Sequence, residues 1–173
     1  MQRQLAEQVD LLRFTNPDQL HITLAFLGRI STEHQSLVVS IVEEVARDLK
    51  PFVLFPLQLG AFPRIKRPSI IWIGLGGDTM PLEHLVLKLE RELSNHHIYP
   101  IRGAGGFAPH IAIAKVSRKD RRHQLHLVTS LLEETRLDLV DLSIPVREIV
   151  VYQSNLGGRG PKHVPLRTVP LGI

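Results

Sequence analysis

The strongest constraint on the fold comes from two short apolar segments that follow the same pattern. Residues 21–24 (HITL) and 110–113 (HIAI) both read His-x-(Thr/Ala)-(Leu/Ile), and they lie about half a chain apart. Their apolar character predicts a strand in each segment, with the first and third residues on one face. The face that packs against helices comprises Ile22, Leu24, Ile111 and Ile113. The open face comprises His21, Thr23, His110 and Ala112.

The elements around these segments occur in the same order twice, which indicates an internal duplication. Periodicity in the first copy predicts a helix at 2–13, a strand at 20–27, a helix at 32–49 and strands at 52–59 and 69–75. The second copy is predicted to contain a helix at 81–97, a strand at 109–115, a helix at 119–134 and strands at 137–143 and 146–152. The repeat units cover about 1–75 and 76–153. The tail, 154–173, has one further predicted strand near 163–169.

Local signals support the ends of the predicted helices. Thr32 and Gln35 have the spacing of a capping box for the second helix, and Pro81 suits the first turn of the third. The first helix would have one apolar face, formed by Leu5, Val9 and Leu12. The strand at 69–75 precedes the third helix, but no counterpart precedes the first, so we expect either compensation for an uncovered sheet edge or reduced stability. Truncation, the tail strand or a second chain would account for the gap.

These elements predict an α+β fold in one bilobal domain, 1–173. Two pseudo-symmetric lobes would each have an antiparallel sheet with helices outside, and a central cleft would hold the two histidines. The chain has 173 residues, of which 43% are apolar, enough for one compact domain or two small lobes.

Composition excludes several classes of protein. Cysteine is absent, which excludes disulfides, thiolate nucleophiles and Cys-based zinc sites. No apolar run approaches the roughly 20 residues of a membrane span, and the first residues lack the pattern of a signal peptide. We therefore expect a cytoplasmic protein without a membrane partner or an obligate protein partner. A net charge of +4 is a mild bias toward anionic partners.

Two imidazoles on facing strands suit phosphodiester chemistry. Histidine titrates near neutrality, so a neutral ring can take a proton from water while a protonated ring gives one to the leaving oxygen. The Thr23 hydroxyl can donate a hydrogen bond to a phosphate oxygen. This scheme needs no metal and no cofactor. A lone histidine on a strand is more often structural, but the paired placement of His21 and His110 favours a catalytic role.

Other candidate features have weaker support. Phe107 is a candidate for stacking on a nucleobase, and its place before a core strand equally suits packing. Arg64 and Arg102 are candidate RNA contacts, as are Lys66 and Arg67, although solvated loop charges are at least as common. The glycines of residues 103–106 precede a strand, so they are not a phosphate-binding loop before a helix.

The two histidine motifs also carry a family resemblance. HITLAFLG at 21–28 and FAPHIAIAK at 107–115 resemble the signature motifs of the two-histidine (2H) phosphoesterase superfamily. More closely, they are similar to its bacterial and archaeal 2′-5′ RNA ligase-like branch, the RNA 2′,3′-cyclic phosphodiesterases. The resemblance covers nearly the whole chain, including residues 52–63, 69–74 and 152–156.

The resemblance implies a hydrolase that opens a 2′,3′-cyclic phosphate on RNA or on a small cyclic nucleotide and leaves a 2′-phosphate. It implies that His21 is the proton donor to the leaving 3′ oxygen and that His110 is the proton acceptor that activates water. The family often has a basic residue five positions after the second histidine. In this chain that residue is Lys115, a candidate phosphate partner.

One residue departs from the family pattern. The second motif has Ala112 where the family normally has Thr or Ser, so one hydroxyl is missing. Loss of a hydrogen bond to a charged group costs roughly 1.5–3 kcal/mol. We therefore keep two alternatives open. One is another 2H activity, such as 2′-5′ phosphodiester cleavage or ligation, and the other is an RNA-end binding module with weak turnover.

Overall fold

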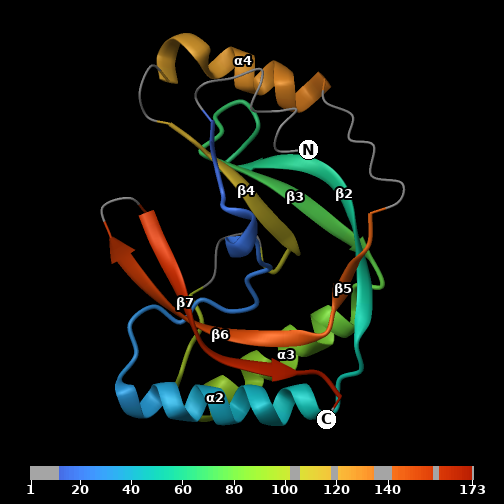
Figure 1. The fold of residues 1–173 in the computed structure, drawn as a ribbon, viewed down its shortest axis with the longest axis vertical. Coiled ribbons are helices and arrows are strands. Elements are labelled where there is room, and N and C mark those ends of the chain that lie inside the picture. Colours follow the sequence, from blue (N-terminus) through green and yellow to red (C-terminus); the bar gives the residue numbers. More distant parts are fainter. Residues whose placement is uncertain (1–11, 102–105, 118–120, 135–141, 158–159, 173) are drawn as a thin grey trace. The chain divides into compact units, whose positions relative to one another are not determined.

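The computed structural model describes residues 12–101, 106–117, 121–134, 142–157 and 160–172. Its helices are α2 (Thr32–Arg47), α3 (Met80–Asn95), α4 (Arg121–Glu134) and the 3-10 helix η1 (Pro17–Gln19). Its strands are β1 (Leu12–Phe14), β2 (Phe52–Phe62), β3 (Ile70–Gly77), β4 (His110–Val116), β5 (Ile144–Val146), β6 (Glu148–Gly157) and β7 (Gly160–Pro170). The mixture of helices with antiparallel strands confirms the predicted α+β class (Figure 1). None of the helices in these ranges is long and apolar enough to cross a membrane.

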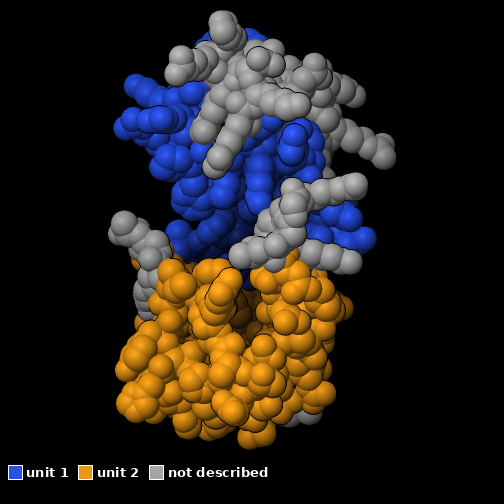
Figure 2. Space-filling model, turned by 90° about the vertical axis from the view of Figure 1, so that its left-hand side faces the viewer, with its two compact units in different colours: residues 1–23, 55–76, 108–143 blue, residues 24–54, 77–107, 144–173 orange. Residues whose placement is uncertain are grey.

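The chain divides into two compact units, each built from three segments (Figure 2). The first unit comprises residues 1–23, 55–76 and 108–143, and the second comprises 24–54, 77–107 and 144–173. Each unit therefore takes segments from both predicted repeats, 1–75 and 76–153. Both motif histidines, His21 and His110, belong to the first unit.

The larger sheet has the strand order β1-β4-β3-β2-β5. Its last strand, β5, pairs with the start of β2. Strands β1 and β3 run antiparallel to β4 on its two sides. Burial alternates along β3, with Ile71, Ile73 and Leu75 buried and the residues between them half-buried. This alternation gives the sheet one core face and one open face.

In the second unit, α2 and α3 lie side by side, and the β6–β7 hairpin packs on α2 (Figure 1). The apolar stripe of each helix supplies the core, as the periodicity predicts. The buried stripe of α2 is Val38, Ile41, Val42, Val45 and Ala46. That of α3 is Leu82, Leu85, Val86, Leu89 and Leu93. Ile149 and Val169 of the hairpin are buried as well.

The chain before His21 differs from the prediction. Residues 12–13, expected at the end of a helix over 2–13, belong to strand β1, whose Leu12 pairs with Val116. Residues 1–11 lie outside the described part of the chain. β1 pairs with β4 of the second copy, so the edge expected in the first copy stays a prediction. The tail strand β7 pairs with β6 and takes no part in this sheet.

Smaller corrections concern element boundaries. The strand predicted at 20–27 is reduced to an isolated bridge at Ile22. Ser31, not Thr32, caps α2, and its hydroxyl accepts a hydrogen bond from the backbone N–H of His34 at 3.3 Å. In the strand predicted at 137–143, residues 137–141 lie outside the described residues and 142–143 are not in a strand. The remaining predicted strands and helices are confirmed to within a few residues, apart from β6, which extends to Gly157.

Candidate active site

His110 is the first residue of β4, and its backbone pairs with Gly74 on β3. Its imidazole Nδ1 lies 2.7 Å from the backbone carbonyl oxygen of Ala108, two residues earlier. The next residue of β3, Leu75, donates a hydrogen bond from its N–H to the carbonyl oxygen of Pro109 at 3.0 Å. This bond holds the backbone just before His110 against β3.

The imidazole of His21 makes the same kind of contact with a backbone carbonyl, but His21 follows a short helix instead of starting a strand. Its Nδ1 lies 2.8 Å from the carbonyl oxygen of Gln19, also two residues earlier. Gln19 ends the short helix η1, which Asn16 caps by accepting a hydrogen bond from the N–H of Asp18. Proline at the first position of η1 presets its backbone angle. The turn therefore sets the direction in which the chain enters His21.

An antiparallel bridge between Ile22 and Ile111 joins the two histidine motifs. Side chains alternate along extended backbone, so His21, Thr23 and His110 project from the opposite side to the two isoleucines. In this register His21 is a diagonal neighbour of His110, a relation that places residues about 7–8 Å apart. Ile111 pairs with Ile73, which is 4% exposed, so the histidines lie on the open face of the sheet.

The carbonyl contacts determine which ring nitrogen is basic. A backbone carbonyl oxygen accepts hydrogen bonds and cannot donate, so Nδ1 of each histidine must carry a proton. In the neutral ring Nε2 is then the nitrogen with the lone pair. Both histidines are thus held in the tautomer that offers Nε2 for proton transfer.

Two aromatic rings contact His110, and sequence reasoning did not identify either of them. The ring centroid of Phe62 lies 5.0 Å from that of His110 in an edge-to-face arrangement, and that of Trp72 lies 5.9 Å away. The Trp72 Nε1 atom is buried and has no hydrogen-bond partner among the described residues, so packing alone holds the indole.

A one-residue irregularity in β4 brings Lys115 to the same face as His110. Simple alternation from His110 places Lys115 on the opposite face. The register, however, shifts by one residue between Ile71 and Trp72, so that Lys115 pairs with Ile70 and His110 with Gly74. Ile70 and Gly74 share a face of β3, because they lie four positions apart and side chains alternate between the two faces. The extra residue is Ile113, which is 1% exposed.

The other predicted site residues have different surroundings. Thr23 is exposed, and Ala112 is half-buried opposite Trp72. Arg64 is exposed in the loop after β2 in the first unit, whereas Phe107 belongs to the second unit. Arg102 lies outside the described residues. Within the described ranges, no group of three or more His, Asp or Glu residues is arranged to hold a metal ion.

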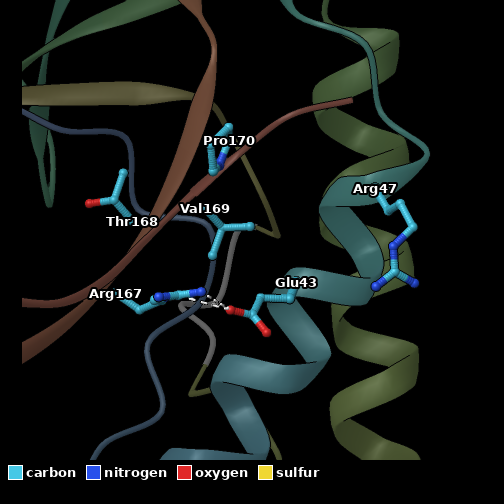
Figure 3. A pocket seen from close by; sticks show the side chains of 6 residues that line it. All are labelled: Glu43, Arg47, Arg167, Thr168, Val169 and Pro170. Atoms are coloured by element: carbon cyan, nitrogen blue, oxygen red, sulfur yellow. Dashed lines mark hydrogen bonds and ion pairs between the residues drawn. The ribbon is translucent and has the colours of Figure 1, made fainter. Parts of the chain in front are cut away.

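A pocket of about 280 Å³ lies in the second unit and contains none of the predicted site residues (Figure 3). It is lined by Glu43, Arg47, Arg167, Thr168, Val169 and Pro170. The guanidinium of Arg167 forms an ion pair with the carboxylate of Glu43, with 2.7 Å between Nη2 and Oε1. We assign the pocket no part in the chemistry of the histidines.

Comparison with known proteins identifies the family. Residues 3–158 match the family model described as the 2′-5′ RNA ligase superfamily. The chain therefore belongs to this superfamily, the 2H phosphoesterases that the motifs indicated. The match spans both histidine motifs and most of the described chain, and it makes this protein a member of an enzyme family.

Named relatives are similar over much of the chain. An RNA 2′,3′-cyclic phosphodiesterase of Aquifex aeolicus is 30% identical over 121 residues, which cover 68% of this chain and 64% of that protein. An RNA 2′,3′-cyclic phosphodiesterase of Aeropyrum pernix is 30% identical over 151 residues, which cover 87% of this chain and 81% of that protein. The chain thus spans less than two thirds of the Aquifex relative.

Solved structures share the fold. A protein of Thermus thermophilus superposes with a TM-score of 0.76 at 21% identity, covering 99% of this chain and 90% of its own. LigT of E. coli, crystallised with 3′-AMP, has a TM-score of 0.70 at 20% identity and covers 98% and 87%. At identities of 20–21%, the structural similarity establishes a shared fold and nothing beyond it.

Proposed function

We propose that this protein hydrolyses the 2′,3′-cyclic phosphate at the end of an RNA to a 2′-phosphate, without a metal ion. The observation that carries the proposal is the matched pair of histidines on one sheet face. Both use Nδ1 toward a carbonyl two residues earlier, and the Ile22–Ile111 bridge makes them diagonal neighbours. A phosphate between the two Nε2 atoms would have an acid on one side and a base on the other.

In the proposed reaction, Nε2 of His110 takes a proton from water as the water oxygen attacks phosphorus. The bond from phosphorus to the 3′ oxygen breaks, and Nε2 of protonated His21 gives its proton to that oxygen. The products are a free 3′-hydroxyl and a 2′-phosphate. The turnover leaves His21 neutral and His110 protonated, and proton exchange with solvent restores the starting state.

Thr23 supports this step as a phosphate partner. Its side chain is exposed on the same face as His21, one residue past the bridged Ile22. Its hydroxyl would donate a hydrogen bond to a non-bridging oxygen, where negative charge increases in the transition state. Lys115 on the same face adds positive charge further along β4. The names of the Aquifex and Aeropyrum relatives support the same substrate class.

Ala112 favours a second candidate, an RNA-end binding protein with weak turnover. It pairs with Trp72 on the open face and offers no hydroxyl there. The phosphate would then lack one hydrogen bond that family members have. The protein would still bind the RNA end, but hydrolysis would be slow.

The test compares two substrates in excess EDTA: a nucleoside 2′,3′-cyclic phosphate and a 2′-5′-linked dinucleotide. We expect hydrolysis of the first and identify the product isomer by chromatography against 2′- and 3′-nucleotide standards. A 2′-phosphate product supports the proposal. Turnover of only the 2′-5′ dinucleotide, loss of all turnover in EDTA, or a 3′-phosphate product contradicts it. Product binding without turnover favours the binding role.

A further inference from the structure

The regular alternation of strand β2 breaks at Leu57 and Gln58, two consecutive residues whose side chains are both exposed. Before the break, Phe55 and Leu57 are exposed and the residues between them are buried. After the break, Gln58 lies four positions from Phe62, whose ring packs on His110, so these two side chains share a face. One extra residue therefore lies in this part of β2, which is the pattern of a β-bulge.

Pro56 gives this break a local cause. Proline has no N–H to donate to a neighbouring strand, so within sheets it occurs at edges and at bulges. Pro56 lies directly before the two consecutive exposed residues. Bulges beside active sites often redirect a side chain. In this sheet the bulge brings the side chain of Gln58 to the face that carries the histidines.

Gln58 lies over Gly74, the residue directly opposite His110. Its Cγ is 3.8 Å from the position that a Cβ at Gly74 would occupy. Leu57 covers Gly76 in the same way, with its Cδ1 2.6 Å from the position of a Cβ there. Because the two glycines lie two positions apart on β3, Gln58 and Leu57 border one continuous part of the open face.

The chemistry of Gln58 suits a nucleobase better than a phosphate. Its amide is uncharged and offers one acceptor and two donors, whereas phosphates are bound most strongly by cations. Within the described part of the chain, this amide makes no side-chain hydrogen bond. Strand β2 lies two strands from β4, about 10 Å away. A nucleoside with its phosphate at His110 can extend over Gly74 toward Gln58.

We infer that Gln58 recognises the base of the nucleotide that carries the cyclic phosphate, and that adenine fits it best. This inference rests on the proposed function. Adenine has a donor next to an acceptor on both of its free edges, so the amide can bind either edge through two hydrogen bonds. Guanine presents two acceptors on one of these edges, and pyrimidines have a smaller ring. The apolar side chain of Leu57 supplies a surface for the face of the base.

The experiment compares Gln58→Met with wild type in the full chain. Methionine is about as long as glutamine and has no amide, so it keeps the packing over Gly74 and removes both hydrogen bonds. Gln153→Met is the matched control, because Gln153 is also an exposed glutamine on a strand, β6. The substrates are the 2′,3′-cyclic phosphates of adenosine, guanosine, cytidine and uridine. A fifth compound, the cyclic 2,3-phosphate of 1,4-anhydroribitol, has the sugar ring without a base.

Wild type should hydrolyse the adenosine compound with the highest kcat/KM of the five. Gln58→Met should lower that value by about five- to tenfold and leave the compound without a base within about twofold of wild type. It should also reduce the differences among the four nucleosides. Gln153→Met should leave all five values near those of wild type. Dissociation constants for the four nucleoside 2′-monophosphates, which need no turnover, should follow the same order.

An equal loss on all five compounds would overturn the inference, because it would place Gln58 at the phosphate or at His110. Unchanged selectivity in Gln58→Met would also overturn it, as would a wild type that prefers another base. If wild type hydrolyses none of the compounds, the proposed function fails. The dissociation constants of wild type and Gln58→Met then decide the inference by themselves.

Discussion

Trp72 and His110 lie with their ring centroids 5.9 Å apart although two register positions separate them. The residue directly opposite His110 is Gly74, and the indole leans over it. A Cβ at Gly74 would lie 3.2 Å from Cζ3 of Trp72, and a Cβ at Gly60 would overlap Cη2 and Cζ2 of the same ring. Two glycines therefore make the space that lets Trp72 reach His110.

Phe62→Leu should reduce catalysis without weakening substrate binding. The Phe62 ring packs edge-to-face on His110, and the carbonyl of Ala108 constrains only one atom of that imidazole. Small errors in the placement of a catalytic group are costly, so kcat should fall by about tenfold with little change in KM. Phe55→Leu is the matched control, because Phe55 lies on the same strand with similar exposure, 46% against 40%.

Nuclear magnetic resonance of the imidazole nitrogens checks the same change without turnover. The His110 ring signals, assigned with His110→Gln, should shift in Phe62→Leu and stay unchanged in Phe55→Leu. A raised KM with unchanged kcat would show that Phe62 contacts substrate instead, and unchanged His110 signals would remove the positioning role.

Gly60→Ala should destabilise the first unit through Trp72. The added methyl group overlaps a rigid indole ring, and overpacking of this kind costs about 1–3 kcal/mol. Gly76→Ala is a suitable comparison, because the three atoms nearest to its Cβ would all belong to the flexible side chain of Leu57, which is 61% exposed. Chemical denaturation should give a clearly lower midpoint for Gly60→Ala than for Gly76→Ala. Equal midpoints would mean that the indole moves aside at no cost.

Ala112→Thr should raise the rate of cyclic phosphate hydrolysis, and Thr23→Val should lower it. Each change adds or removes one hydroxyl on the face shared by the histidines. A hydrogen bond to a charged group contributes about 1.5–3 kcal/mol, which corresponds to roughly 10- to 100-fold in rate if it forms in the transition state. Steady-state kinetics on a nucleoside 2′,3′-cyclic phosphate measures both. A slower Ala112→Thr enzyme would mean that the space beside Trp72 excludes the hydroxyl.

The ion pair between Lys88 and Asp48 should contribute to stability only above acidic pH. The hydrogen bond from Lys88, 2.8 Å long, and then the charge of Lys88 lower the pKa of Asp48 below its ordinary value of 3.8. A carboxyl whose folded pKa is depressed stabilises the folded state above its unfolded pKa and loses that contribution as pH falls through the folded pKa. Both groups are partly or fully solvated, so the effect is small.

Thermal unfolding of wild type and Asp48→Asn at several pH values measures this contribution. Wild type should have the higher Tm near neutral pH, and the two curves should converge as the pH falls through the lowered pKa of Asp48. A Tm difference that is constant from neutral to strongly acidic pH would assign the effect to packing instead of charge.

Sequence pattern was sufficient for the helices α2 and α3 and for the placement of the two histidines on one sheet face. Apolar residues at a period of 3.6 predict both helices, and their buried faces agree with that period. The repeated His-x-(Thr/Ala) pattern predicts two histidines on one face, and the Ile22–Ile111 bridge agrees. These features depend on the spacing of residues that are close together in the sequence, so they can be predicted from the sequence alone.

Features that depend on pairing between distant residues were not predictable. Leu12 has helical spacing with Leu5 and Val9, but its contact with Val116 on β4 places it in a strand. The face of Lys115 depends on the extra residue Ile113, which alternation alone does not reveal. Trp72 was missed because only the glycines around it allow its ring to reach His110.

The most direct test of the account is single-site replacement of the two histidines with a third histidine as control. Hydrolysis of a nucleoside 2′,3′-cyclic phosphate in EDTA is measured for wild type, His21→Ala, His110→Ala and His34→Ala, which lies exposed on α2. We predict that each motif replacement lowers kcat by about 100- to 10,000-fold, the range of general acid–base catalysis, while His34→Ala and the Tm values stay near wild type. Near-wild-type turnover by folded His21→Ala or His110→Ala would contradict the two-histidine mechanism.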